Sequence, residues 1–235
     1  MTTIRIVGFG MGPRHLTSEA IQALRSSTYV LATAKRDDDP LLAIRREIAQ
    51  VHNLDMVVVP DPERDRDPSD YDQAVRDWHS ARTHVFREVI GSREGDPAFL
   101  VWGDPALYDS TIRVVTSLGL PYEVVAGISA PQLLAARHGI VLHGVGQPVH
   151  VTTERRLRDD IAAGQTNLFV MLTSGIALDG LDDWTIWWGA NLGTTSEQLV
   201  AGIIRDVREE LVNARETAKR EAGWVMDVYL LRGPT

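Results

Sequence analysis

Short apolar runs alternate with helical segments through the first half of the chain, and this alternation restricts the fold more than any other feature. The runs are continuous and rich in β-branched residues, and they occupy residues 4–7, 29–34, 56–59, 98–102 and 122–126. Segments with apolar residues at helical spacing separate them, at residues 18–27, 40–52, 71–90 and 107–118. Continuous apolar strands are typical of sheets buried on both faces, so the pattern predicts an α/β domain with a parallel sheet.

The second half of the chain has a different texture. A helix is expected to about His138, and longer strand-like segments follow at residues 148–153, 167–172, 184–190 and 224–231. One long helix, residues 196–219, is predicted just before the last of these segments. We therefore expect two domains: residues 1–127 with the parallel sheet, and residues 128–235 forming a smaller α/β domain with a mixed sheet.

The composition argues against several classes of function. The 235 residues include no cysteine, which excludes disulfides and thiolate metal sites and agrees with a cytoplasmic location. The seven histidines show no metal-binding spacing, so we predict no metal site. A formal net charge of −8 argues against non-specific nucleic-acid binding. The apolar run at the N-terminus is too short to span a bilayer, and no membrane association is expected.

The first strand ends in a glycine-rich loop, Gly8-Phe9-Gly10-Met11-Gly12-Pro13. Its third glycine falls one position early for the G-x-G-x-x-G fingerprint of dinucleotide-binding proteins. The loop is either a tight strand-to-helix turn or a ligand-binding loop, because α/β proteins bind ligands at the carboxyl ends of their strands. The chain contains neither G-x-S-x-G nor G-x-x-x-x-G-K, which argues against a serine hydrolase and an ATPase.

A second glycine loop follows the strand at residues 98–102, in the stretch VWGDPALYDST. Gly103 would let a ligand approach the main chain, and Asp104 can accept hydrogen bonds from hydroxyl or amino groups of a ligand. Alternatively, Asp104 caps a helix that begins with Pro105. Tyr108 follows one turn later, where a core aromatic is more common than a functional phenol. The loop by itself leaves these interpretations open.

Four strings of residues, in this order and spacing, carry a resemblance over nearly the whole chain: VGFGMGPRHLT, VWGDPALYDST, VVAGISAPQLLAARHGIVL and GWVMDVYLLR. Together they resemble the tetrapyrrole methylases of cobalamin biosynthesis. Three further strings, VVVPDPERDR, VRDWHSAR and WWGANLGT, narrow the resemblance to the branch that methylates precorrin-5 at C-1 and releases its acetyl group as acetate. The resemblance implies a two-domain α/β fold of the tetrapyrrole methylase type, a homodimer, and a cleft between the domains that binds S-adenosylmethionine.

Carried over position by position, the resemblance also implies which residues border the cofactor. They come from both glycine loops and from the second half of the chain: Gly10, Gly12, Pro13, Trp102, Gly103, Asp104, Tyr108, Ser129, Ala130, Met171, Leu172, Trp188, Gly189 and Ala190. The substrate carbon has enamine character and the sulfonium is an activated methyl donor, so the protein mainly aligns the two and excludes water. Acetate release needs water to add to the acetyl carbonyl, and Asp104 and Tyr108 are the candidate catalytic residues for that step.

The sequence departs from the family pattern at several positions. The first loop lacks the aspartate of G-x-G-x-G-D-P and is one residue shorter, Gly144 stands where arginine is frequent, and Thr173 where aspartate is frequent. An anionic macrocycle would then be held by other basic residues, with Arg36, Arg64, Arg66, Arg113, Arg137 and Arg155 as candidates. Three alternatives stay open: a precorrin C-methyltransferase without deacetylation, a non-catalytic tetrapyrrole-binding relative, and a nicotinamide-dependent oxidoreductase.

Overall fold

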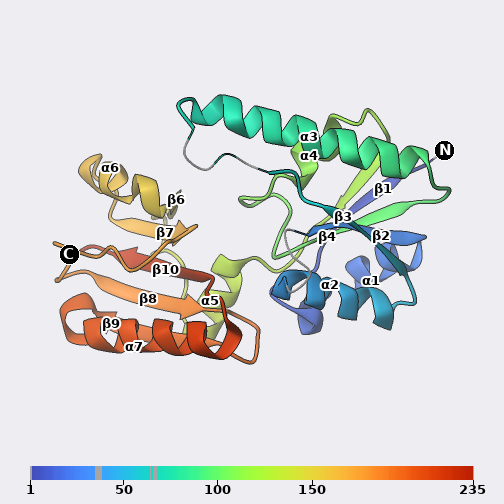
Figure 1. The fold of residues 1–235 in the computed structure, drawn as a ribbon. Coiled ribbons are helices and arrows are strands. Elements are labelled where there is room, and N and C mark those ends of the chain that lie inside the picture. Colours follow the sequence, from blue (N-terminus) through green and yellow to red (C-terminus); the bar gives the residue numbers. More distant parts are fainter. Residues whose placement is uncertain (1, 35–38, 64, 66–67, 235) are drawn as a thin grey trace. The chain divides into compact units, whose positions relative to one another are not determined.

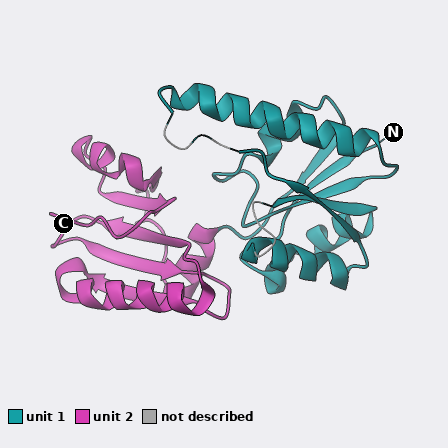
Figure 2. Cartoon of the chain, in the orientation of Figure 1, with its two compact units in different colours: residues 1–129 teal, residues 130–235 magenta. Residues whose placement is uncertain are grey.

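The computed structural model describes residues 2–34, 39–63, 65 and 68–234. The chain divides into two compact units, residues 1–129 and 130–235, whereas the sequence placed the boundary after residue 127 (Figure 2). Each unit has its own sheet and its own hydrophobic core.

The first unit contains a five-stranded sheet in which every neighbouring pair is parallel. Its strands, in the spatial order β3-β2-β4-β1-β5 (Figure 1), are β1 (Ile4–Gly8), β2 (Tyr29–Ala34), β3 (Asp55–Pro60), β4 (Pro97–Val101) and β5 (Tyr122–Val125). The predicted parallel sheet is confirmed. Each strand end lies within about one residue of its predicted position, because the strands are the short apolar runs that helices cover on both faces.

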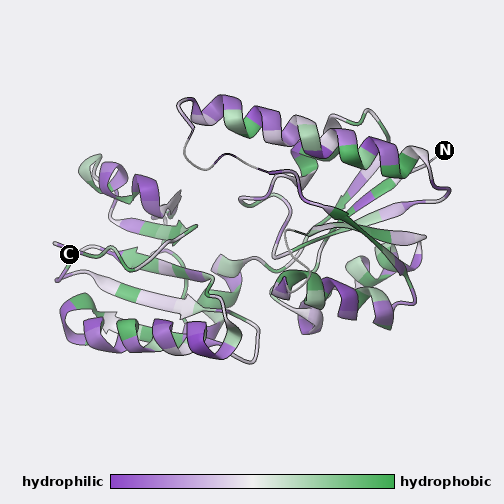
Figure 3. Cartoon of the chain, in the orientation of Figure 1, coloured by the Kyte–Doolittle hydropathy of each residue, from purple (hydrophilic) through white to green (hydrophobic). Residues whose placement is uncertain are grey.

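Two pairs of helices cover the two faces of this sheet. They are α1 (Ser18–Arg25), α2 (Pro40–Val51), α3 (Tyr71–Gly91) and α4 (Thr111–Thr116). α1 and α2 pack on one face in a core with Phe9 and Leu100, and α3 and α4 pack on the other with Ile6 and Phe99 (Figure 1). Figure 3 shows the strands as largely hydrophobic and α3 as striped with hydrophilic and hydrophobic residues. Successive strand residues point to opposite faces, so neighbouring residues such as Phe99 and Leu100 serve different cores.

Side-chain caps define where three of these helices begin. Thr17 Oγ1 accepts a hydrogen bond from the N–H of Ala20 at 3.0 Å and caps α1. Asp39 and Asp70 cap α2 and α3 in the same way, each accepting from a main-chain N–H at 2.9 Å. Each bond satisfies a donor that has no partner within the first turn of its helix.

The predicted start of α4 was wrong. The helix begins at Thr111 rather than at residue 107. Asp104 Oδ1 accepts from the N–H of Ala106 at 2.8 Å and closes a turn, and Tyr108 has a φ of 52°, which a right-handed helix cannot include. Pro105 therefore lies in a turn, and the interpretation of Asp104 as a helix cap is wrong.

Asp96 ties the beginning of the chain to the loop before β4. Its carboxylate accepts from the N–H of Thr3 at 2.8 Å and from the guanidinium of Arg5 at 3.1 Å. The bond from Thr3, followed by Arg5, lowers the pKa of Asp96 below its usual value. A carboxyl whose pKa is lowered in the folded state stabilises the fold above its unfolded pKa of about 3.9, and this contribution disappears as the pH falls through the folded pKa.

We therefore expect Asp96→Asn to lower the urea midpoint at neutral pH and to have little effect in acid below the folded pKa. Asp55→Asn, at an exposed position at the start of β3, should change the midpoint little at either pH. Urea titrations monitored by circular dichroism give both comparisons. An Asp96→Asn effect of the same size at both pH values would show that the charge of this carboxylate is not the stabilising feature.

The second unit contains a mixed sheet in the order β6-β7-β10-β8-β9. Its strands are β6 (His150–Thr153), β7 (Asn167–Met171), β8 (Thr185–Ala190), β9 (Gln198–Ile203) and β10 (Asp227–Arg232), and its helices are α5 (Ala130–His138), α6 (Leu157–Ala162) and α7 (Ile204–Ala222). β6 and β7 pair in parallel and the other neighbours are antiparallel, which confirms the predicted mixed sheet. No helix among the described residues is long and apolar enough to cross a membrane.

The prediction of one long helix over residues 196–219 was wrong in its first part. Residues 198–203 form β9, which pairs antiparallel with β8, and α7 begins only at Ile204. Val200 is buried in the core that α7 and the sheet share. Local propensity does not distinguish this segment from the helix that follows, and the pairing with β8 decides its structure.

Candidate active site

The loops after β1 and β4 lie where the connections of the first sheet diverge. β1 and β4 are neighbours, paired in parallel from Arg5↔Ala98 to Gly8↔Val101. α1 follows β1 and packs on one face, whereas α4 follows β4 and packs on the other. In open α/β sheets, ligands bind at the carboxyl ends of the strands where neighbouring loops leave towards opposite faces. The topology therefore places the two glycine loops at the expected ligand-binding edge.

The two glycine loops contact each other through Gly10 and Gly103. The N–H of Gly103 donates to the carbonyl of Gly10 at 2.8 Å, and the N–H of Gly10 donates to the carbonyl of Gly103 at 3.2 Å. Both residues are in the left-handed region, with φ of 68° and 71°, which glycine adopts without strain. A Cβ on Gly10 would also lie 2.6 Å from the Cβ of His15. The two glycine loops therefore meet at the carboxyl edge of the sheet.

A third loop, after β5, joins this pair through Gly127. A Cβ on Gly127 would lie 2.2 Å from the carbonyl oxygen of Gly103 and 2.8 Å from the carbonyl carbon of Gly8. Asp104 links the loops as well, because its Oδ2 accepts from the N–H of Gly127 at 2.9 Å. With Oδ1 bonded to the N–H of Ala106, both carboxylate oxygens hold the main chain. Asp104 is thus fixed in orientation, and its remaining lone pairs can still accept hydrogen bonds.

Of the other cofactor residues predicted in the first unit, Ser129 lies beside Gly103. Met11 Sδ and Ser129 Cα are the atoms nearest to the position of a Cβ on Gly103, at 3.7 and 4.0 Å. These are ordinary contact distances, so the backbone conformation of Gly103 rather than crowding requires a glycine. Trp102 packs edge-to-face on Phe9, with ring centroids 5.5 Å apart. Beyond Gly12, the chain turns through a single 3₁₀ turn, Pro13–His15.

Tyr108 is exposed and conformationally strained. Its side chain is 45% exposed, which excludes the interpretation as a core aromatic. Its φ of 52° costs roughly 1–2 kcal/mol for a residue other than glycine. Strained residues of this kind cluster at functional sites, where the surrounding structure holds them. The strain therefore supports a functional interpretation of Tyr108.

The remaining predicted cofactor residues lie in the second unit, at the start of α5, the end of β7 and the end of β8: Ala130, Met171, Leu172, Trp188, Gly189 and Ala190. The indole of Trp188 is fully buried and donates to the carboxylate of Asp227 at 3.2 Å. A Cβ on Gly189 would lie 2.8 Å from Leu134 Cδ1 of α5. Leu172, by contrast, is 64% exposed with a φ of 54°. Trp188 and Ala190 thus build the core of this unit, while Leu172 is available at its surface.

Gly8 and Gly127 belong to the loop contact but were missed as site residues in the sequence. A usable signal was present, because Gly8 is the last residue of β1, and Gly127 and Gly103 each lie two residues after the end of a strand of the parallel sheet. Only some of the arginines considered for binding the macrocycle can be located in the structure. Arg36, Arg64 and Arg66 lie outside the described residues. Arg137 pairs with Glu197 at 2.8 Å, and Arg113 lines a hollow formed by residues of α3 and α4.

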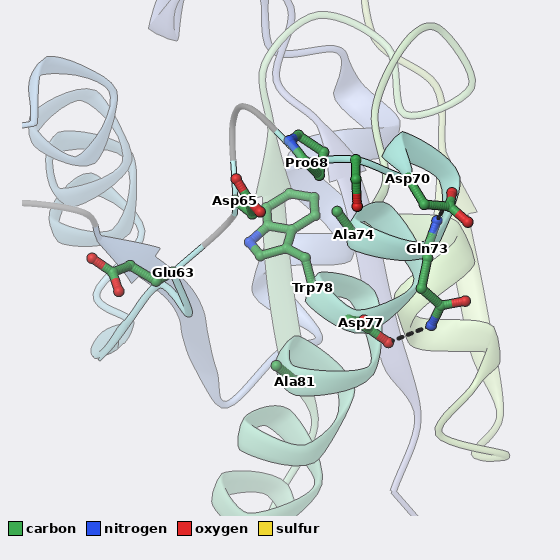
Figure 4. Close-up of a pocket in the computed structure, with 10 residues that line it drawn as sticks. Glu63, Asp65, Pro68, Asp70, Gln73, Ala74, Asp77, Trp78 and Ala81 are labelled. Atoms are coloured by element: carbon green, nitrogen blue, oxygen red, sulfur yellow. Dashed lines mark hydrogen bonds between the residues drawn. The ribbon is translucent and has the colours of Figure 1, made fainter.

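A separate hollow of about 470 Å³ lies at the beginning of α3 (Figure 4). Trp78 forms part of its wall, and the charged residues that line it within the described part of the chain are Glu63, Asp65, Asp70 and Asp77. Gln73 bridges this lining, donating to Asp77 at 2.7 Å. None of its described lining residues is among the predicted site residues. No cluster of histidine, aspartate and glutamate suited to a metal ion occurs among the described residues.

The fold and the paired glycine loops define a class of protein. Residues 3–208 match the family of Tetrapyrrole (Corrin/Porphyrin) Methylases. The chain belongs to this family, and the resemblance in its sequence is confirmed.

Particular relatives refine this assignment. The precorrin-6A synthase (deacetylating) of a Sinorhizobium species is 36% identical over 249 aligned positions, which cover 99% of this chain and 95% of the relative. A crystal structure from Corynebacterium diphtheriae, described as a cobalamin synthesis related protein (CobF), is 35% identical with a TM-score of 0.84, covering 99% of this chain and 98% of that one. Diphthine synthase is 14% identical with a TM-score of 0.67, covering 100% and 91%, and this likeness shows the fold alone.

Proposed function

We propose that this chain is an S-adenosylmethionine-dependent C-methyltransferase of cobalamin biosynthesis that acts as a precorrin-6A synthase (deacetylating). The proposed reaction is methylation of precorrin-5 at C-1 with release of acetate. The observation that carries the proposal is the 36% identity, over 99% of this chain, to a relative of that name. Membership of the tetrapyrrole methylase family supports the reaction class independently.

The contact between the glycine loops of the first unit leaves room for a cofactor to approach the main chain. Glycines at 10 and 103 keep side chains away from the strand ends, and the nearest atoms to a Cβ on Gly103 leave ordinary contact space. Ligand atoms can therefore approach the main chain there. We propose that the residues assigned by resemblance in both units hold the cofactor. Trp188 and Ala190 are buried, so they would shape the site from the hydrophobic core of the second unit. S-adenosylmethionine, when bound, supplies an activated methyl group.

The residues of the site are suited to orientation more than to acid–base chemistry. Methyl transfer to a nucleophilic ring carbon requires alignment and exclusion of water, which rigid glycine loops provide. Loss of the acetyl group requires water to add to its carbonyl, and a general base assists this step. We propose Asp104 and Tyr108 for that role, because Asp104 is fixed by two main-chain bonds and Tyr108 is exposed on the same loop. A homodimer and a cytoplasmic location complete the proposal.

The activity test is incubation of the purified protein with precorrin-5 and methyl-labelled S-adenosylmethionine. Label in the macrocycle together with an equal amount of acetate is the expected result. Methylation without acetate would indicate another precorrin C-methyltransferase, and tight macrocycle binding without turnover would indicate a non-catalytic relative. Affinity for NAD in place of S-adenosylmethionine would indicate the oxidoreductase alternative.

Asp104→Ala tests the cofactor site directly. The change removes both main-chain bonds of the carboxylate and frees the loop after β4 from the loop after β5. We expect affinity for S-adenosylmethionine, measured by titration calorimetry, to fall roughly 5- to 150-fold, which corresponds to about 1–3 kcal/mol. Asp55→Ala, at the amino-terminal edge of the same sheet, should leave affinity unchanged. Unchanged affinity in Asp104→Ala would remove Asp104 from the cofactor site.

A further inference from the structure

β2 and β4 separate near their carboxyl ends and leave a gap in the first sheet. The two strands are paired only at Tyr29↔Pro97 and Val30↔Ala98, although β2 continues to Ala34 and β4 to Val101. Unpaired main-chain groups inside a sheet are costly unless other groups satisfy them. The gap therefore raises the question of what occupies it.

The guanidinium of Arg45, from α2, occupies part of the gap. Its Nε donates to the carbonyl of Leu100 at 2.9 Å. The carbonyl of Val101 accepts from Phe9 on the β1 side, so the carbonyl of Leu100 points towards β2 by the alternation of a strand. Arg45 thus replaces the hydrogen bond that β2 would make in a continuous sheet. The Nη groups of Arg45 make no hydrogen bond within the described residues.

A cavity of about 100 Å³, room for several water molecules, lies beside this arginine. Its polar lining includes Arg45, Arg82, Thr33, Asp109 and Thr111. Arg45 reaches it from α2 on one face of the sheet, and Arg82 from α3 on the other. It lies at the carboxyl-terminal edge of the strands, where α/β proteins bind ligands. The loop that carries Gly103 continues directly to Asp109 and Thr111, so this cavity and the glycine contact share one loop.

The charge of Arg82 is already balanced. Its Nε donates at 2.6 Å to Asp61, whose side chain is only 2% exposed, and its Nη2 donates to Thr33 Oγ1 at 3.2 Å. The guanidinium carbon also lies 4.0 Å from the ring centroid of Trp78. Arg82 is therefore held in one orientation with a donor group at the cavity wall.

The charge of Arg45 is not balanced in this way. Within the described residues, no carboxylate oxygen lies within 4.0 Å of its nitrogens. Burial lowers the pKa of the Arg45 guanidinium, and Asp39 and Asp109 oppose this shift only in part. Asp109 is exposed, so water screens its charge, and its Oδ1 accepts a hydrogen bond from the N–H of Thr111. Arg45 is only partly exposed, and a partly desolvated cation without a close partner is costly unless a ligand supplies the missing anion.

We propose that this cavity binds a carboxylate group of a ligand against the free Nη groups of Arg45. A guanidinium is suited to this role because its planar fork matches the two oxygens of a carboxylate. The ligand we infer is the tetrapyrrole substrate, which rests on the proposed function, and the carboxylate of the cofactor is the other source of the same chemistry. Neither Arg45 nor Arg82 was among the basic residues nominated from the sequence.

The first test uses acetate alone, compared with chloride at equal ionic strength, on the full chain. Acetate should raise the melting temperature of the wild type and of Arg46→Met, whose arginine is exposed at the next position of α2, but not that of Arg45→Met. This result does not depend on turnover, so failure of the proposed function would leave it standing. Equal shifts, or no shift, in all three proteins would overturn the proposal.

The second test compares two larger probes on the same proteins. Uroporphyrin, a stable tetrapyrrole whose ionisable side chains are carboxylates, should bind Arg45→Met about tenfold or more weakly than wild type, since a charge-assisted bond contributes roughly 1.5–3 kcal/mol. S-adenosylhomocysteine should bind both proteins equally. Weakening of S-adenosylhomocysteine alone would assign the carboxylate to the cofactor. A lower melting temperature of unliganded Arg45→Met, with both affinities unchanged, would show a structural role only and reject the site.

Discussion

Replacing Gly127 by alanine is expected to destabilise the first unit by about 3 kcal/mol or more and to abolish binding of S-adenosylmethionine. The new Cβ would lie 2.2 Å from the carbonyl oxygen of Gly103 and 2.8 Å from the carbonyl carbon of Gly8. Both neighbours are main-chain atoms that are held in place, because Gly8 ends β1 within the sheet and Gly103 is hydrogen-bonded to Gly10, so neither can move without disturbing the loops. Overpacking against main chain leaves no rotamer through which the strain can relax.

Gly91→Ala is the matched control for this change. Gly91 ends α3, and a Cβ there would have no neighbour within 4 Å. The same added methyl group should leave stability unchanged or raise it by roughly 0.5–1 kcal/mol through lower entropy of the unfolded chain. Urea unfolding and calorimetry with S-adenosylmethionine give the two readouts. Wild-type affinity in a stable Gly127→Ala protein would mean that the three-loop contact is not part of the cofactor site.

Asp227→Asn is expected to destabilise the second unit by about 3 kcal/mol or more. The side chain of Asp227 is 1% exposed and accepts from Arg215 at 3.0 Å. Trp188 and Thr173 donate to the same carboxylate, at 3.2 and 2.5 Å. The amide has nearly the same shape but no charge, and it leaves the guanidinium of Arg215 without its buried partner. Removing one member of a buried ion pair is more costly than removing both.

A double-mutant cycle measures this interaction. The double variant Asp227→Asn/Arg215→Gln should lose less stability than the sum of the two single variants, because it leaves no unpaired charge. Asp179→Asn, at an exposed position of the same unit, is the control. Four of the six tryptophans lie in this unit, so tryptophan fluorescence during urea unfolding reports mainly on it: Trp184, Trp187, Trp188 and Trp224. Additive effects would show that the pair contributes nothing beyond its separate members.

The same cluster explains one departure of the chain from the family pattern. Thr173 stands where aspartate is frequent, and its hydroxyl donates to the carboxylate of Asp227. The polar centre of the second unit therefore depends on Asp227 in β10. The sequence presented Asp227 only as part of a strand, because nothing local indicates that a charge in an apolar run is paired across the unit.

Much of the first sheet could be predicted because its information is local. Apolar runs bounded by glycine and charged residues specify strands. Thr17 marks the start of α1, because it caps the helix through a bond to a residue only three positions away. Prediction failed where distant segments decide. Residues 198–203 form β9 because β8 is available to pair with them, and α4 starts late because the bonds of Asp104 and the conformation of Tyr108 keep the preceding residues in turns.

By itself, the sequence determined the alternation of strands and helices, the parallel and mixed sheets, and membership of the tetrapyrrole methylase family, since these follow from local periodicity and from long strings of residues. Only the tertiary structure decided that Gly8, Gly103 and Gly127 touch, that Asp104 joins two loops, and that Arg45 fills a gap between two strands. These contacts join residues far apart in the chain. Their energies depend on close approach of main-chain and charged groups, which no local pattern records.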